Sequence, residues 1–141
     1  MPRRLSALFV LLVSATFSAC SKSDSPTGPT TLSGKYQGPA SDVTGSGVLT
    51  LNVSQSGSTV SGTAITSATA GSPGTSGTVS GTLSGSTLTF TITFTTSNPP
   101  CTITISGTAT GLTSSTIAGT YSATSTCGNP VSGGTFSLTK Q

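Results

Sequence analysis

The sequence contains no histidine, tryptophan or glutamate, and its only acidic residues are Asp24 and Asp42. No charged residue occurs between Val43 and Thr139. General acid–base catalysis needs a group that titrates near the working pH, usually His, Asp or Glu. A serine nucleophile needs a base within reach, and zinc or calcium needs several His, Cys or carboxylate ligands. These absences argue against an enzyme, and we expect no metal and no cofactor.

Basic residues are also scarce in the long charge-free part of the chain. Arg3 and Arg4 lie at the N-terminus, and only Lys35 and Lys140 flank that part. Two lysines so far apart cannot supply the row of phosphate contacts on which nucleic-acid binding depends. We therefore expect no nucleic-acid partner.

An apolar stretch near the N-terminus indicates export. Thirteen mostly apolar residues, 5–17, follow the two arginines and lead into Ser18-Ala19-Cys20. The stretch is shorter than the roughly 20 residues that a transmembrane helix needs, and a basic head before a short apolar core is typical of a secretory signal peptide. The residues around Cys20 resemble the lipobox of bacterial lipoproteins, although Phe17 stands where that family prefers Leu. An ordinary signal peptide with an incidental Cys20 is the alternative.

The lipoprotein resemblance implies three segments. Residues 1–19 are the signal peptide, Cys20 is lipidated, and residues 20–31 form a polar tether whose composition cannot support a packed core. Residues 32–141 are then one all-β domain. The resemblance implies a lipid-anchored protein of the bacterial cell envelope, and Ser21 favours the outer over the inner membrane, because inner-membrane members often carry Asp there. The membrane face stays open.

Two further cysteines, Cys101 and Cys127, fall in the folded part. Exported proteins usually pair such cysteines. A hairpin about the 111–115 turn would place Cys101 opposite a position about two residues from Cys127. We predict a disulfide between them. The alternative, a redox or metal-binding pair, lacks CxxC spacing and a helix start that would lower a thiol pKa.

Apolar residues alternate with Thr and Ser throughout residues 32–141, which is typical of half-buried antiparallel strands. The turn signals between these runs predict eight strands, near residues 33–38, 46–54, 58–66, 77–83, 87–96, 101–110, 115–123 and 133–140. Most connections are short, so the order is a meander. Four of the strands carry a central glycine, within 60–64, 79–83, 105–109 and 117–121. Repeated bending by glycine is what a small closed barrel demands.

The way in which sheet edges are protected distinguishes a barrel from a β-sandwich. Exposed sheet edges usually carry charge or Pro, but among the expected strands only the first and last carry a lysine. We therefore expect these two strands to pair and close an up-and-down barrel, with a β-sandwich as the alternative. Gly34-Lys35-Tyr36 also resembles the Gly-x-Trp opening of lipocalins and related calycin barrels. That resemblance implies a basic residue over the aromatic ring, a role that Lys140 could fill.

Two functions fit these observations. One is a binding module for a small apolar or uncharged ligand, since an eight-stranded barrel can hold one. The candidate lining residues are Leu51, Phe90, Phe94, Ile103 and Tyr121, with small residues such as Gly62 and Gly107 leaving space between them. The other is a structural, adhesion or interaction lipoprotein whose barrel is filled and whose Ser/Thr surface meets an envelope protein.

Overall fold

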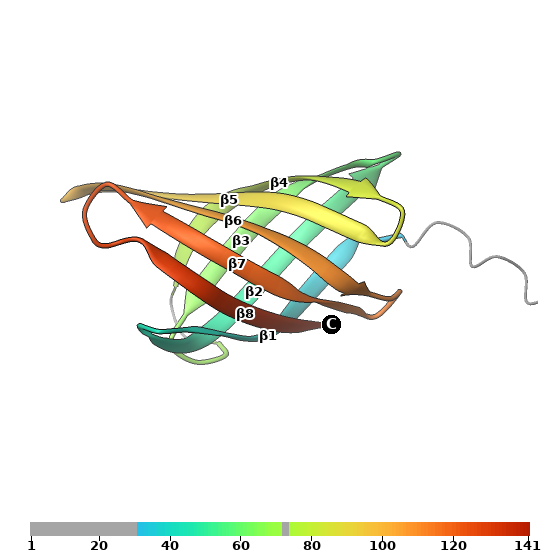
Figure 1. Cartoon of the computed structure of the whole chain (residues 1–141), viewed down its shortest axis with the longest axis horizontal. Helices are drawn as coiled ribbons and strands as arrows, with labels where there is room; N and C mark the ends of the chain where they lie inside the picture. Colours follow the sequence, from blue (N-terminus) through green and yellow to red (C-terminus); the bar gives the residue numbers. More distant parts are fainter. Residues whose placement is uncertain (1–30, 72–73) are drawn as a thin grey trace, which may run out of the picture.

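The protein closes into a single β-barrel. The structure, a computed structural model, describes residues 31–71 and 74–141, so the expected signal peptide, Cys20 and almost all of the tether lie outside the described residues. The strands are β1 (Gly34–Asp42), β2 (Gly45–Ser56), β3 (Thr59–Ser67), β4 (Thr75–Ser84), β5 (Thr87–Ser97), β6 (Pro100–Leu112), β7 (Thr116–Ser125) and β8 (Val131–Lys140). Each strand pairs antiparallel with the next, and β8 pairs with β1 (Figure 1). The expected eight-stranded up-and-down barrel is confirmed, and the sandwich alternative is wrong.

The seam between β1 and β8 shows how the barrel closes. Tyr36 pairs with Lys140 and Ala40 with Phe136, so Lys35 and Lys140 both lie on the two strands of the seam, as expected. β1 continues four residues beyond its expected end at residue 38. Pro39 does not stop it, because the recorded β1–β8 pairs skip this residue, whose nitrogen cannot donate. Its partner on the other side is Val48 of β2.

The glycines within the strands allow close approach between neighbours. A Cβ atom on Gly62 would collide with the carbonyl oxygen of Asn52, and one on Gly119 with that of Thr108. Only glycine tolerates such an approach of one strand to the next. These glycines therefore permit close approach between neighbouring strands. They do not leave space for a ligand, because the neighbouring backbone occupies it.

The two ends of the barrel differ in how they are covered. At one end β1 begins, β8 finishes, and the hairpin turns at Gly57 and Gly85 take the positive φ values of 58° and 59° that tight hairpins require. Leu32, just before β1, is fully buried there. We call this the closed end; it lies at the right of Figure 1. The other end carries the β1–β2 turn and the β3–β4, β5–β6 and β7–β8 connections, and we call it the open end.

A disulfide joins Cys101 and Cys127 at the open end, with Cα atoms 5.5 Å apart. Ile103 pairs with Ser125 across β6 and β7, and the same register places the two cysteines directly opposite each other. The sequence predicted the bond but placed the register about two residues away. The difference arises because the turn is centred later in the chain than expected, and the bulge between Ala109 and Gly111 offsets about one residue of that shift.

Candidate functional site

The open end holds a cavity of about 440 Å³, which we call the cup. Its volume falls in the lower part of the range of roughly 300–1,000 Å³ that is usual for small-molecule sites. The wall is mostly apolar and comes from every strand except β4. The lining residues are Ala40, Asp42, Thr44, Gly45, Ser46, Gly47, Val48, Leu49, Thr66, Ser67, Phe90, Ile92, Ile103, Ile105, Tyr121, Ala123, Val131 and Phe136.

Two phenylalanines form the floor of the cup. The rings of Phe90 on β5 and Phe136 on β8 meet edge to face, with centroids 5.4 Å apart and planes at 86°. Together with Leu49 they border both the cup and the interior below it. That lower interior leaves only about 10 Å³ of free space, so side chains fill the closed half. The barrel is therefore half filled and half hollow.

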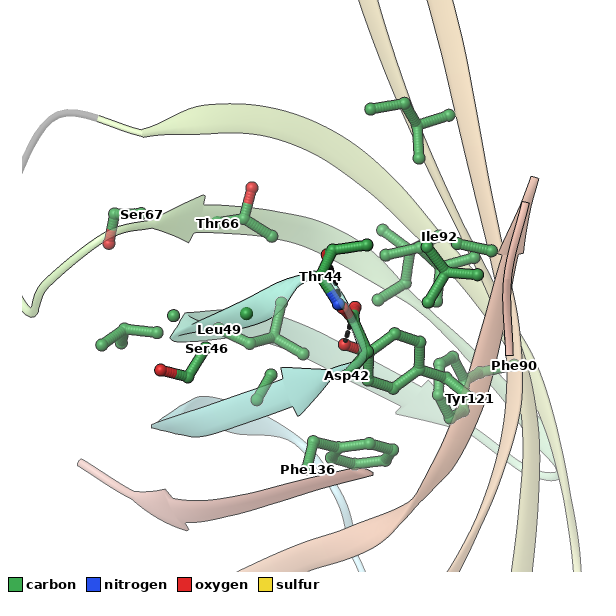
Figure 2. Close-up of a pocket in the computed structure, with 18 residues that line it drawn as sticks. Asp42, Thr44, Ser46, Leu49, Thr66, Ser67, Phe90, Ile92, Tyr121 and Phe136 are labelled. Atoms are coloured by element: carbon green, nitrogen blue, oxygen red, sulfur yellow. Dashed lines mark hydrogen bonds between the residues drawn. The ribbon is translucent and has the colours of Figure 1, made fainter. Parts of the chain in front are cut away.

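A carboxylate lies among the cup's lining side chains. Asp42, the last residue of β1, accepts hydrogen bonds on Oδ1 from the Thr44 amide at 2.8 Å and the Thr44 hydroxyl at 2.5 Å. Its Oδ2 accepts the Tyr121 hydroxyl at 2.8 Å. The bond to the amide two residues ahead is the usual Asx arrangement of a turn. Figure 2 shows the carboxylate held between Thr44 and Tyr121.

Tyr121 reaches Asp42 by lying across β8. Its ring covers Gly134, where an added Cβ would overlap the ring carbons. Gly107 makes similar room on the other side, since a Cβ there would lie 2.8 Å from Phe90 Cζ and 3.0 Å from Tyr121 Cβ. These two glycines let the aromatic side chains of the cup occupy one layer across β5–β8.

The hydrogen bonds favour the charged form of Asp42 and the neutral form of Tyr121. The Thr44 side-chain bond is the main reason that the Asp42 pKa is lowered, with the Thr44 amide and the Tyr121 hydroxyl next. Burial first, and then the bond to Asp42 and its charge, raise the Tyr121 pKa to about 12. At neutral pH the site therefore presents one fixed negative charge beside a neutral phenol that donates a hydrogen bond to it.

The closed end has a different aromatic arrangement. The Lys140 ammonium lies 5.6 Å from the centre of the fully buried Tyr36 ring, within the range of cation–π attraction. Gly34 makes room for it, because a Cβ there would lie 2.6 Å from Lys140 Cε. The placement expected from the calycin resemblance is present. The buried Tyr36 hydroxyl finds no hydrogen-bond partner among residues 31–71 and 74–141.

Comparison with known proteins returns nothing: no protein-family model, no curated protein and no solved structure matches the chain. Within the described part of the chain, no helix is long and apolar enough to cross a membrane. No group of three or more His, Cys, Asp or Glu side chains that could hold a metal ion occurs among the described residues. The cup's own geometry is therefore the basis for a functional proposal.

The structure divides the five candidate lining residues. Phe90 lies in the floor of the cup, and Ile103 and Tyr121 lie in its wall. Leu51 borders the filled interior of the closed half instead. Phe94 is buried in the core cluster but does not line the cup.

Sequence reasoning did not place Asp42 in the site. A solitary carboxylate supports neither glycoside hydrolysis nor a metal site, so the sequence indicates no role for it. A signal was nevertheless present, because Asp followed two residues later by Thr and then Gly is typical of a turn capped by the Asp side chain. Phe136, Leu49 and Ile105 were also missed as lining residues. An inward-facing apolar residue lines the cup only if it lies above the filled half of the barrel, and the sequence pattern does not give the position of that boundary.

Proposed function

We propose that this protein is a non-catalytic, lipid-anchored binding module of the bacterial envelope, and that it holds one small, mainly apolar molecule in the cup. The observation that carries the proposal is the half-filled interior: an apolar cavity of about 440 Å³ stands over a floor beneath which almost no free space remains. A barrel that served only as a scaffold would gain stability from filling both halves.

The order of the chain supports an accessible cup. Residues 31–33 enter the barrel at the closed end, where the Leu32 amide bonds to Gln55 Oε1 at 2.8 Å and Ser33 Oγ accepts the Gln55 amide at 2.9 Å. A lipid on Cys20 would therefore act through the tether on the end opposite the cup. Such an anchor leaves the mouth of the cup away from the attachment point, open to a ligand in the aqueous compartment.

The proposal is tested by filling the cup with a larger side chain. Ala123→Phe places a ring in the cavity wall, while Ala118→Phe, on the outward-alternating position of the same strand, adds the same bulk outside. Native mass spectrometry of the full chain from its bacterial host should find a small molecule retained by the parent and by Ala118→Phe but lost from Ala123→Phe. Absence of any bound molecule, with no uptake of a hydrophobic fluorescent probe, would refute the binding proposal.

A second candidate rests on the outer wall. Cross-strand pairing aligns a row of threonines from β3 around to β8: Thr59, Thr82, Thr89, Thr108, Thr120 and Thr135. All six are exposed and none is charged, so the row offers a continuous hydrogen-bonding surface around the outer wall for an envelope partner. If Ala123→Phe empties the cup of ligand while the protein keeps its cellular role, this interaction function replaces the first.

The anchor has its own test. Cys20→Ala should move the protein from the membrane fraction to the soluble fraction, because lipidation needs the thiol. Cys20→Ala that stays with membranes would overturn the anchor while leaving the binding proposal intact. Fractionation followed by immunoblotting measures the outcome.

A further inference from the structure

The cup has one charged group, and that charge is negative. Asp42 is the only acidic side chain among the described residues, and it lines the cup. The two described cations lie elsewhere: Lys35 is near the start of β1, and Lys140 lies over Tyr36 at the closed end. No positive side chain of the described chain therefore offsets Asp42 at the cup.

The carboxylate is held in place by its neighbours. Three hydrogen bonds from Thr44 and Tyr121 fix both oxygens. Tyr121 in turn is seated on Gly134 and lies 6.5 Å, centroid to centroid, from the floor residue Phe136. Tyr121 therefore lies between the Asp42 carboxylate and the apolar floor. A ligand whose apolar body rests on the floor has its polar end close to Asp42.

We propose that the cup selects amphiphiles by head group, taking an apolar body that ends in an ammonium and rejecting one that ends in a carboxylate or phosphate. This inference rests on the proposed binding function and narrows its ligand class. An ammonium beside Asp42 gains charge attraction in a partly desolvated site, whereas an anion meets like charge and no compensating cation. A neutral head group falls between the two. The five lining residues expected from the sequence carry no charge and so favour an uncharged ligand, but the structure adds the Asp42 carboxylate to the lining.

The experiment compares three probes with one apolar body: octylammonium, octanol and octanoate. Their affinities for the full chain are measured by isothermal titration calorimetry at neutral pH and low salt. We expect octylammonium to bind about threefold to fivefold more tightly than octanol, as for a partly exposed ion pair, and octanoate to bind more weakly than octanol. Added salt should narrow these differences because it screens charges that solvent reaches.

Asp42→Asn should bring the three affinities to within about twofold of one another, since it removes the charge and keeps the size of the side chain. Gln141→Lys is the matched control, because it also raises the net charge by one but lies at the closed end. It should keep the order of affinities. Tyr121→Phe, which keeps the carboxylate, should also keep the order. Circular dichroism checks that each variant retains its β-structure.

Each outcome bears on a different claim. Octanoate binding as tightly as octylammonium would overturn the head-group inference while leaving the binding function standing. The same holds if Asp42→Asn leaves the order unchanged. If none of the three probes binds, both the inference and the proposed function fail. Should Asp42→Asn not fold, the order of affinities in the parent chain and its response to salt still decide the matter.

Discussion

The same eight strands build the two ends of the barrel, but different interactions hold each end together. At the closed end, backbone groups at strand ends bond to neighbouring turns: the Leu83 amide of β4 donates to the Ser58 carbonyl at 2.7 Å, and the Lys140 amide of β8 to the Ser115 carbonyl at 2.8 Å. Buried leucines and isoleucines fill the space behind them. At the open end a disulfide, a backbone bond from the Thr126 amide to the Thr102 carbonyl at 3.0 Å and a few side-chain hydrogen bonds hold the rim around an unfilled cup. Side-chain packing thus fills one end, whereas the other end relies on the disulfide and keeps space for a ligand.

The largest effect that tests this comparison is loss of the disulfide. Cys101→Ser with Cys127→Ser should cost about 3.5 kcal/mol of unfolding free energy by the loop-entropy model for a sequence separation of 26 residues. Chemical denaturation measures the loss. Because few other interactions hold the rim, limited proteolysis of this variant should cleave first within residues 97–102 and 125–131. First cuts at the closed-end turns would contradict the assignment of stability.

A matched pair of isoleucines compares the two halves directly. Ile117, which is 1% exposed, packs in the closed half, while Ile105 lines the cup. Ile117→Ala should cost about 3 kcal/mol, within the range for fully buried truncations. Ile105→Ala should cost about 1 kcal/mol or less, because its side chain already borders empty space. Equal losses in denaturant titrations would mean that the cup is filled in solution.

Gly134→Ala tests how the cup's polar pair is positioned. The added methyl group overlaps the Tyr121 ring, so the ring must move away from Asp42, at a cost of about 2 kcal/mol for overpacking. Gly128→Ala is the control, because a Cβ there meets only Ser125 Oγ, at 3.8 Å. In a Tyr121→Ala background, Gly134→Ala should cost little. A full cost in that background would show that the glycine serves the backbone and not the ring.

The two tyrosines should respond oppositely to loss of the hydroxyl. Tyr121→Phe removes a hydrogen bond to a carboxylate and should destabilise the protein by about 1 kcal/mol, near the low end for such bonds because the pair is partly exposed. Tyr36→Phe removes a buried hydroxyl that has no partner in the described chain, so stability should stay the same or rise. Equal destabilisation by both substitutions would indicate that the Tyr36 hydroxyl is satisfied in solution.

Titration tests the hydrogen bond between Tyr121 and Asp42. Folding raises the Tyr121 pKa from 10.0 to about 12. The contribution of Tyr121 to the free energy of unfolding is therefore complete below pH 10 and is lost as pH rises through 12. Asp42 acts in the opposite direction: its pKa is lowered from 3.8, so its contribution is present above that value and is lost in stronger acid. Ultraviolet titration of the Asp42→Asn variant should give a lower Tyr121 pKa than in the parent, though still above 10.0 because burial remains. An unchanged value would place Tyr121 away from Asp42.

The sequence predicts most of this fold because the signals for it are local. Alternation from Leu88 to Phe94 marks β5, and the lysines on the first and last strands indicate the seam. The cup was not predictable in the same way. Whether an inward-facing residue contacts solvent or the core depends on two long-range contacts. Leu32 covers one end, and Phe90 of β5 packs against Phe136 of β8. These contacts join residues far apart in sequence, and no periodicity reports them.

The smallest effect concerns the cation at the closed end. Lys140→Met keeps the length and much of the apolar stem of the side chain while removing its charge, so it should cost about 0.5 to 1 kcal/mol through loss of the attraction to the Tyr36 ring. Lys35→Met is the matched control on the partner strand, where the side chain is exposed, and it should change stability by less. A double-mutant cycle with Tyr36→Leu isolates the pair. If the losses in unfolding free energy are additive, Lys140 has no specific interaction with the Tyr36 ring. The packing of apolar side chains would then be sufficient to stabilise the closed end.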